Sequence, residues 1–376
     1  MQDFEGIRPY RDDEVARVID RLAGDPELNH AVCVFLLPGL ERRAPALAHW
    51  LMRLYLKWQS RRYRNVAEFQ TFLTGHMARL IDDTIEELTV EGLEQLPTDV
   101  PYLFMSNHRD IFMDAGLVNF VINRAGHETA RSAVGDNLLS RRFAADLMRL
   151  NKSFVVERSA SGARSVYAAL SRTSHYIRHS LAEGHSVWIA QRQGRSKDGF
   201  DRTDPALVKM LGLAYRDDEL ELGEVVGQMR IVPVAISYEL DPCDRIKAHE
   251  LFVTDREGSY SKPPDEDLIS IVEGMIGYKG RVHLHFSAPL QGEFADPEAV
   301  AHAIDREIVT GMRVFPTHVQ AAREQGTGLE CDTVAPLPEV QARFAERLTN
   351  CPAAEQPYLL AGYANLLRNR QEFNLA

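Results

Sequence analysis

The chain has 376 residues, of which 45% are hydrophobic and 26% are charged, and its formal net charge at pH 7 is -11. This composition is typical of a globular protein with a sizeable core. The negative charge excludes general nucleic-acid binding, which needs a basic surface for the phosphates, and disfavours attraction of the whole surface to anionic lipid. The four cysteines lie far apart, without metal-ligand spacing or the density of a disulfide framework, so a reducing cytoplasm is expected.

Residues 1–84 are predicted to form an N-terminal helical region, because apolar residues recur at helical spacing across 12–22, 46–56 and 66–81. The segment 46–56 supports two interpretations: it packs against other helices, or it docks on a lipid surface through aromatic and basic side chains. The side chains that suit docking are Trp50, Leu51, Leu54, Tyr55 and Trp58, with Arg61, Arg62 and Arg64. The longest apolar run, 31–40, has about half the length that spans a bilayer, so no membrane-spanning segment is expected.

Residues 85–296 alternate between predicted strands and predicted helices, which indicates an α/β fold with helices on both faces of a sheet. Strands are expected near 86–91, 101–106, 131–134, 153–157, 186–191, 230–237 and 281–286. Helices are expected near 114–125, 139–150, 160–183 and 204–214. Residues 297–376 are predicted to form a C-terminal helical extension, with helices near 296–308, 338–348 and 354–370.

Residues 106–114 carry the clearest candidates for chemistry. They read Ser-Asn-His-Arg-Asp-Ile-Phe-Met-Asp and lie where a predicted strand turns into a predicted helix. A neutral histidine can take a proton from an alcohol, and a carboxylate beside it can orient the ring. His108 with Asp114 is the preferred pair, and Asp110 is a rival carboxylate. An ordinary polar turn, with the histidine bonded locally, is the alternative without catalysis.

Further polar blocks follow in a fixed order. Gly-Asp-Asn-Leu-Leu at 135–139 precedes Asn-Lys-Ser-Phe-Val-Val-Glu-Arg-Ser at 151–159. An apolar strand then runs into the basic loop Gln-Arg-Gln-Gly-Arg-Ser-Lys at 191–197, and Ile-Val-Pro-Val opens the strand at 231–239. Together with the His108 block, these segments resemble the glycerolipid acyltransferase superfamily, and most closely its glycerol-3-phosphate acyltransferase branch. The resemblance extends over roughly residues 85–290.

The resemblance implies a mixed sheet flanked by helices, with 1–84 and 297–376 outside an acyltransferase domain at 85–296. It implies transfer of a fatty acyl group from acyl-CoA or acyl carrier protein to the hydroxyl of glycerol 3-phosphate or a lysophospholipid. The acyl thioester is a co-substrate, and no cofactor is expected. The process would be phospholipid biosynthesis within lipid metabolism, in a cytoplasmic protein that contacts the inner face of the membrane peripherally.

The acceptor is expected to be anionic. Arg158 ends a predicted strand at a helix start, and Arg195, Ser196 and Lys197 form a basic loop between glycines, so these four are the candidate phosphate ligands. An ion pair with a neighbouring carboxylate is the alternative for each arginine. Other candidates for the pocket are Asn107, Asp110, Gln193 and Gly194.

The chain departs from the family pattern at three places. Five residues separate His108 from Asp114, where the family has four, and Val155 stands where the family has phenylalanine. Gln193 aligns with the family's glutamate, although this alignment can shift by a residue. These departures keep two alternatives open: a catalytically weakened protein that binds lipid or acyl groups, and a hydrolase of acyl thioesters.

No metal site is expected. His175 and His179 have the four-residue spacing that can bind a metal on a helix, but no carboxylate stands at matching spacing to complete the site.

Overall fold

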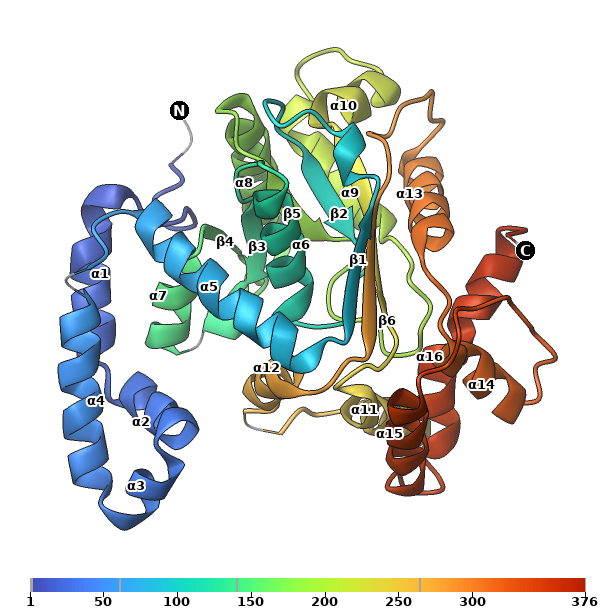
Figure 1. Cartoon of the computed structure of the whole chain (residues 1–376). Coiled ribbons are helices and arrows are strands. Elements are labelled where there is room, and N and C mark those ends of the chain that lie inside the picture. Colours follow the sequence, from blue (N-terminus) through green and yellow to red (C-terminus); the bar gives the residue numbers. More distant parts are fainter. Residues whose placement is uncertain (1–2, 61, 140, 264, 376) are drawn as a thin grey trace. The chain divides into compact units, whose positions relative to one another are not determined.

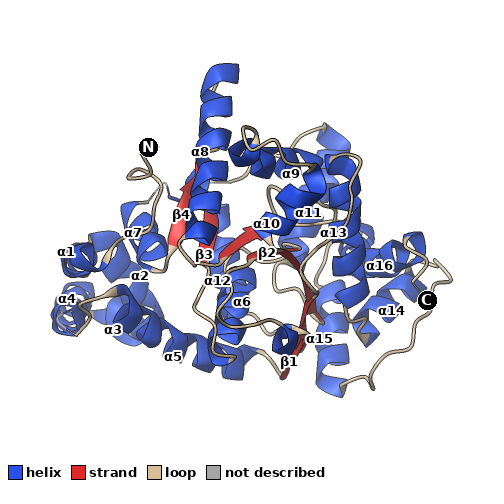
Figure 2. Cartoon of the chain, turned by 90° about the horizontal axis from the view of Figure 1, so that it is seen from above, coloured by secondary structure: helices blue, strands red, loops and turns tan. Residues whose placement is uncertain are grey.

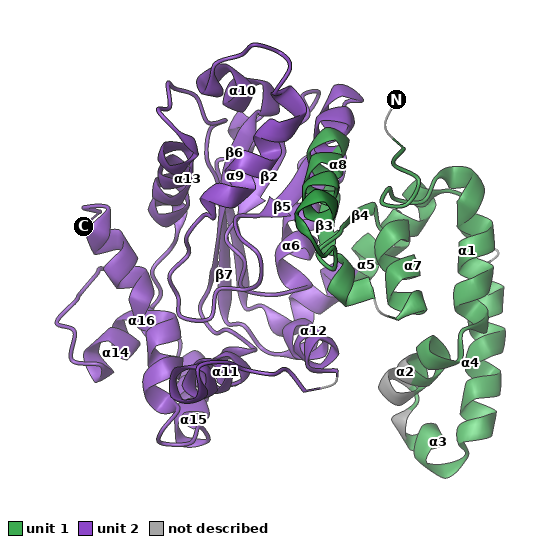
Figure 3. Cartoon of the chain, turned by 180° about the vertical axis from the view of Figure 1, so that it is seen from behind, with its two compact units in different colours: residues 1–76, 131–176 green, residues 77–130, 177–376 purple. Residues whose placement is uncertain are grey.

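The computed structural model describes residues 3–60, 62–139, 141–263 and 265–375. Residue contacts divide the chain into two compact units, which Figure 3 colours separately. The first unit comprises residues 1–76 and 131–176, and the second comprises residues 77–130 and 177–376.

The second unit is built on a mixed sheet, as expected from the sequence. Its strands lie in the order β1-β7-β6-β2-β5. Their bounds are β1 (Glu87–Glu91), β2 (Leu103–Ser106), β5 (Val187–Ala190), β6 (Ile231–Tyr238) and β7 (Arg281–Phe286). The pair β6–β7 is antiparallel, whereas β1–β7, β2–β6 and β2–β5 are parallel. All eight residues of β6 are buried, which explains why its sequence is a nearly continuous apolar run.

Helices surround this sheet (Figures 1 and 2). They are α6 (Met113–Arg124), α9 (Pro205–Gly212), α10 (Leu222–Met229), α11 (Asp244–Glu257), α12 (Glu266–Ile276), α13 (Pro297–Gly311), α14 (Pro316–Glu324), α15 (Pro338–Thr349) and α16 (Gln356–Glu372). The main core lies between α6, the end of α5 (Val66–Thr84) and one face of the sheet. It includes Met77, Ile81, Leu117, Phe104, Val232 and Phe286.

The parallel strands β2, β5 and β6 bring their carboxyl ends to one edge of the sheet. Ser106, the last residue of β2, is in register with Ala190 and Val234, and β6 continues from there to Tyr238. In sheets of this kind, substrates bind beyond the carboxyl ends of the strands. The predicted catalytic block follows β2 directly, and the basic loop follows β5 directly.

The first unit contains most of the N-terminal helices and a short parallel pair, β3 (Arg131–Gly135) with β4 (Ser153–Val156). Its helices are α1 (Asp12–Gly24), α2 (Pro26–Leu36), α3 (Pro38–Arg43), α4 (Pro45–Ser60), α7 (Arg142–Leu150) and the first parts of α5 and α8 (Ala163–Ala182). One apolar cluster joins Val15, Val18 and Phe69 to Phe143 and Leu150 of α7.

This grouping differs from the three consecutive regions expected from the sequence. Residues 131–176 pack with the N-terminal helices, and the buried carboxylate of Asp146 binds Arg21 Nη2 at 2.7 Å and Tyr10 at 2.7 Å. The described C-terminal helices belong to the same unit as the mixed sheet. In the described chain, no helix is both long enough and apolar enough to cross a membrane.

Candidate active site

His108 and Asp114 are in direct contact in the second unit. His108 lies in the loop after β2, and Asp114 lies in the first turn of α6. The ring atom His108 Nδ1 is 2.8 Å from Asp114 Oδ2. The aspartate side chain is fully buried, whereas the histidine side chain is 15% exposed. A histidine that donates from Nδ1 to a carboxylate keeps Nε2 free to accept a proton.

The carboxylate of Asp114 accepts hydrogen bonds from three further donors. The backbone N–H groups of Arg109 and Asp110 donate to Oδ2 at 2.7 and 2.9 Å, and the Tyr238 hydroxyl donates to Oδ1 at 2.8 Å. The loop therefore curls around the carboxylate, which explains how five intervening residues still bring His108 beside Asp114. A carboxylate with this many donors is held in one orientation, and it fixes the imidazole in turn.

Asp110, the rival carboxylate, has a different role in the structure. Its Oδ1 accepts the backbone N–H groups of Phe112 and Met113 at 2.9 and 2.8 Å, at the start of α6. Its Oδ2 is buried and has no hydrogen-bond partner among the described residues. Burial, followed by the nearby charge of Asp114, raises the pKa of Asp110 to about 6. Asp114 is thus the carboxylate that orients His108.

The basic loop after β5 lies beside the histidine. The backbone N–H of Ser196 donates to the carbonyl of His108 at 2.7 Å. Arg195 is only 6% exposed, and its Nη2 donates to Ser270 Oγ of α12 at 3.1 Å. Its Nη1 is buried and has no partner in the described part of the chain. A buried guanidinium nitrogen without a partner is costly, so a ligand that supplies an oxygen would be stabilised there.

The other predicted loop residues are placed less favourably for a ligand. The ammonium of Lys197 pairs with Glu250 at 2.8 Å, and the Ser196 hydroxyl donates to the carbonyl of Phe200 at 3.3 Å. Gln193 and Gly194 are exposed. The phosphate-binding role predicted for Ser196 and Lys197 would require these contacts to open.

Two further predicted residues, Asn107 and Arg158, make contacts of other kinds. Asn107 is fully buried and bonds the backbone N–H and C=O of Ile236 at 2.8 and 3.0 Å, so it joins β2 to β6. Arg158 belongs to the first unit, where its guanidinium packs against Gly135, and its predicted role in the acceptor site stays a prediction.

Arg109 joins the loop that carries His108 to the C-terminal helix α16. Its guanidinium binds Asp201 Oδ2 at 2.5 Å and the carbonyls of Gly362 and Gly199 at 3.2 and 3.4 Å. Gly199 has φ = 81°, and a Cβ there would lie 2.6 Å from the Gly362 carbonyl oxygen. Only glycine permits this approach. Helix α16 therefore supports both the loop that carries His108 and the basic loop.

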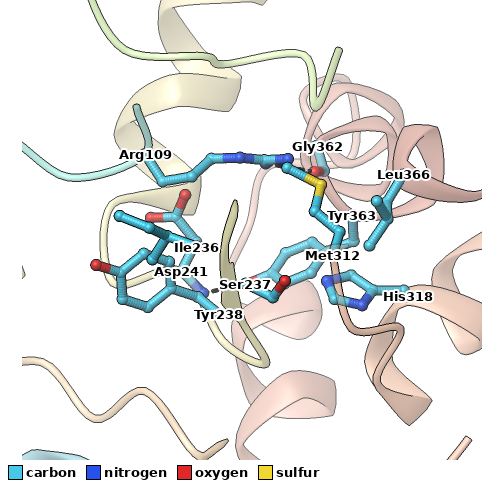
Figure 4. Close-up of a pocket in the computed structure, with 10 residues that line it drawn as sticks. All are labelled: Arg109, Ile236, Ser237, Tyr238, Asp241, Met312, His318, Gly362, Tyr363 and Leu366. Carbon is cyan, nitrogen blue, oxygen red and sulfur yellow. Dashed lines mark hydrogen bonds between the residues drawn. The ribbon is translucent and has the colours of Figure 1, made fainter. Parts of the chain in front are cut away.

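Two asparagines of α16 extend this support. The Asn365 and Asn369 amides donate to the carbonyls of Asp198 and Gly199 at 2.6 and 3.3 Å. Figure 4 shows the small cavity beneath Arg109, lined also by Tyr238 and His318. Burial lowers the pKa of His318 to about 3, so this ring stays neutral beside the guanidinium.

Several residues of this site were missed by sequence reasoning. Tyr238 is the last residue of a correctly predicted strand, and Arg109 lies inside the predicted block, but neither was assigned a role. Gln191 directly follows β5, is fully buried, and has no partner for either side-chain polar atom among the described residues. These residues could have been found from the parallel pairing of β2, β5 and β6, because this pairing places the carboxyl ends of the three strands at one edge of the sheet.

Comparisons with known proteins give one clear match. The family model described as Acyltransferase matches residues 87–237, which include His108, Asp114 and the basic loop. No curated protein matches the sequence. Among solved structures, the chain is similar to the 1-acyl-sn-glycerophosphate (LPA) acyltransferase PlsC from Thermotoga maritima. The identity is 14%, the match covers 84% of this chain and 100% of that chain, and the TM-score is 0.38. From the family model, residues 87–237 therefore form an acyltransferase domain.

Proposed function

We propose that this protein transfers a fatty acyl group from the thioester of acyl-CoA or acyl carrier protein to the hydroxyl of glycerol 3-phosphate or a lysophospholipid. The observation that carries the proposal is the contact of 2.8 Å between His108 Nδ1 and Asp114 Oδ2, made by a carboxylate with three other donors. This arrangement supports a general base whose Nε2 is free for the acceptor hydroxyl.

The proposed reaction needs only groups that the site offers. His108 Nε2 removes the hydroxyl proton as the acceptor oxygen attacks the thioester carbonyl carbon, and the carbonyl electron pair moves to oxygen. When that pair returns, the carbon–sulfur bond breaks, and the departing thiolate takes the proton from the imidazolium. Asp114 stabilises the imidazolium between these two steps. The products are the ester and the free thiol.

An anionic acceptor is supported by the unpartnered polar atoms after β5. Arg195 Nη1 and the Gln191 amide are buried without partners in the described chain, and Ser196 of the same loop contacts the His108 carbonyl. A phosphate oxygen on Arg195 would satisfy the free donor and hold the acceptor near His108. Substituting Arg195→Lys should therefore raise the KM for the acceptor more than the KM for the donor.

The deciding experiment is an assay of the whole chain with a labelled acyl thioester. Glycerol 3-phosphate and lysophosphatidate are supplied as separate acceptors, with CoA and acyl carrier protein thioesters as separate donors. Acceptor-dependent ester formation supports transfer and identifies the substrates. Release of free fatty acid at a rate that does not depend on the acceptor indicates a hydrolase. Binding of the thioester without turnover indicates an acyl-binding protein. Either of the last two results overturns the proposal.

Membrane contact from the cytoplasmic side is proposed on the basis of α4. Its inner face packs Ala48 and Met52 against Cys33, so the helix-packing interpretation holds for that face. Its outer face exposes a row of large apolar side chains: Leu47, Trp50, Leu51, Leu54, Tyr55 and Trp58. The guanidinium of Arg62 stacks on Trp58 at 4.9 Å. Arg61 lies outside the described residues. Aromatic rings beside cations suit the interface of an anionic bilayer.

Sedimentation with vesicles tests this contact. The full chain should bind vesicles that contain phosphatidylglycerol more tightly than vesicles of phosphatidylcholine alone. The double substitution Trp50→Ala with Trp58→Ala should remove most of this binding, and both side chains are more than half exposed, so the fold should be retained. Equal binding by the variant and the unmodified chain would assign the contact to another surface.

A further inference from the structure

Three consecutive helices of the first unit bring two histidines and one glutamate to a single point. His30 lies on α2, Glu41 on α3 and His49 on α4. His30 Nδ1 and His49 Nε2 are 3.1 and 3.0 Å from the same oxygen, Glu41 Oε1. The two ring nitrogens are 3.5 Å apart. These residues have no part in the acyl transfer proposed for His108.

The spacing of the three atoms suits a bound metal ion. Zinc binds histidine nitrogen and carboxylate oxygen at about 2.0–2.2 Å, and a tetrahedral arrangement then separates neighbouring ligand atoms by about 3.4 Å. The observed separations of 3.0, 3.1 and 3.5 Å need only small movements to reach that geometry. Two histidines and one glutamate are also a recurrent protein ligand set for zinc, with water in the fourth position.

The partners of Glu41 leave its charge available to a cation. Its ion-pair partners in the described chain are the two histidines, which carry charge only when protonated. Its second oxygen, Oε2, is buried and has no hydrogen-bond partner among the described residues. The glutamate side chain is 12% exposed, so its negative charge is largely removed from water. A divalent cation would compensate this charge directly.

A second grouping in the other unit shows what an unsuitable cluster looks like. Glu91, His283 and His285 also place ligand atoms close together. There, however, Arg313 Nη2 pairs with Glu91 at 2.5 Å, and His283 Nδ1 is 2.8 Å from Thr89 Oγ1. A permanent cation already neutralises that carboxylate. The first grouping has no such guanidinium on its glutamate in the described structure.

We propose that His30, Glu41 and His49 form a binding site for a divalent transition-metal ion, with zinc as the best fit and a water molecule as the fourth ligand. The ion would cross-link α2, α3 and α4. The buried apolar core between these helices is small, because it consists of Cys33, Ala48 and Met52 among the described residues. A metal ion that binds only the folded state would therefore stabilise a region in which buried apolar contacts contribute little.

The test uses the full chain after chelator treatment and dialysis. Titration with zinc should show about one tight site, and cobalt should give the intense visible absorption of a tetrahedral Co²⁺ centre. His30→Ala and His49→Ala should each weaken zinc binding by at least about tenfold and abolish the cobalt spectrum. His249→Ala is the matched control, because His249 also contacts a glutamate, Glu355, at 2.9 Å and is half exposed, and among the described residues no second histidine contacts that glutamate.

Thermal unfolding gives an independent measurement. Zinc should raise the Tm of the unmodified chain and of the His249→Ala variant, and this rise should grow with zinc concentration. The His30→Ala and His49→Ala variants should fold without zinc, since these side chains are 61% and 39% exposed, and should show no such rise. Unchanged zinc affinity in both variants, or absence of zinc binding by the unmodified chain, overturns the proposal whether or not the protein transfers acyl groups.

Discussion

Two of the histidine–carboxylate groupings in the described structure, His108 with Asp114 and His30 and His49 with Glu41, have opposite surroundings. The carboxylate of Asp114 is fully buried and accepts four hydrogen bonds, one from a histidine, two from backbone N–H groups and one from a tyrosine. The carboxylate of Glu41 meets two histidines at one oxygen, and its other oxygen has no partner in the described structure. The same two chemical groups, imidazole and carboxylate, therefore stand in surroundings that suit different chemistry.

The difference lies in what each carboxylate still needs. Both oxygens of Asp114 are bound by N–H or O–H donors, so a metal ion would have to displace these bonds, and the carboxylate serves to orient one imidazole. Glu41 has negative charge that its neighbours do not neutralise unless the histidines protonate. A carboxylate whose two oxygens are both hydrogen-bonded favours a proton-transfer role for its histidine. A carboxylate with an oxygen that lacks a partner favours binding of a cation.

The largest effect is expected from His108→Ala, which removes the proposed base. Acyl transfer should fall by at least about 100-fold, because general-base catalysis typically contributes roughly 10²–10⁴-fold. The measurement is kcat with saturating donor and acceptor, with circular dichroism to show that the variant is folded. His30→Ala is the matched control from the other grouping, and it should keep transfer near the unmodified level. Equal losses in the two variants would remove the distinction between the groupings.

A third carboxylate, Asp110, sharpens the comparison, since it is buried and one of its oxygens has no hydrogen-bond partner among the described residues. Its pKa is raised to about 6, so the folded state holds this proton more tightly than the unfolded state does. The stability from this group is therefore full below about pH 4 and is lost as pH rises through 6, by roughly 3 kcal/mol in all.

Asp110→Asn should remove this pH dependence, because the asparagine side chain does not titrate. Its oxygen can still accept from the backbone N–H groups of Phe112 and Met113, so the start of α6 should be retained. Urea unfolding between pH 4 and pH 7.5 measures the effect. Between these limits, the unmodified chain should lose roughly 2 kcal/mol more of its unfolding free energy than the variant loses. Parallel pH curves for the two proteins would show that Asp110 is not neutral in the folded state at low pH.

A smaller effect is expected from Tyr238→Phe, which removes one of the four donors to Asp114. Since a hydrogen bond to a charged group contributes at least about 1.5 kcal/mol, kcat should fall about tenfold or more. KM should change little, because Tyr238 acts through Asp114 and not on the substrate. Tyr102→Phe is a control in the same core, where the hydroxyl donates to the Pro97 carbonyl at 3.3 Å. An altered KM with unchanged kcat would reassign Tyr238 to substrate binding.

The smallest effect is expected from Gln193→Glu. Gln193 is exposed in the loop that carries Arg195, so the added charge should change transfer by no more than about twofold. Steady-state rates with both acceptors provide the measurement. Gln191→Glu places the same charge at a fully buried position two residues earlier, and it should lower activity more strongly. A large loss at Gln193 and none at Gln191 would contradict this order of effects.

Much of the fold follows from local sequence pattern. The apolar runs predicted as strands near 230–237 and 281–286 are β6 and β7, and the polar block after β2 contains both members of the His108–Asp114 contact. These features depend on neighbouring residues, whose spacing can be read directly. The helices α10, α11, α12 and α14 were not expected. Helix α12 then supplies Ser270 to Arg195, and its Gly274 lies against Asp110.

The rest depends on pairs that are far apart in sequence. Tyr238 reaches Asp114 across 124 positions, and Arg109 reaches Asp201 across 92. His30, Glu41 and His49 are separated by 11 and 8 positions on three helices, so they match no single-helix metal motif. Such contacts depend on how helices and strands pack in three dimensions, and the local sequence pattern does not specify this packing.

The hydrogen bond from Arg109 to the Gly362 carbonyl joins positions that are 253 residues apart. During synthesis, the histidine and its aspartate leave the ribosome long before the backbone that seats the neighbouring guanidinium. A chain released after residue 237 would contain every residue of the family match and none of α16. Chains that end before α16 are therefore expected to lack this support for the loop that carries His108.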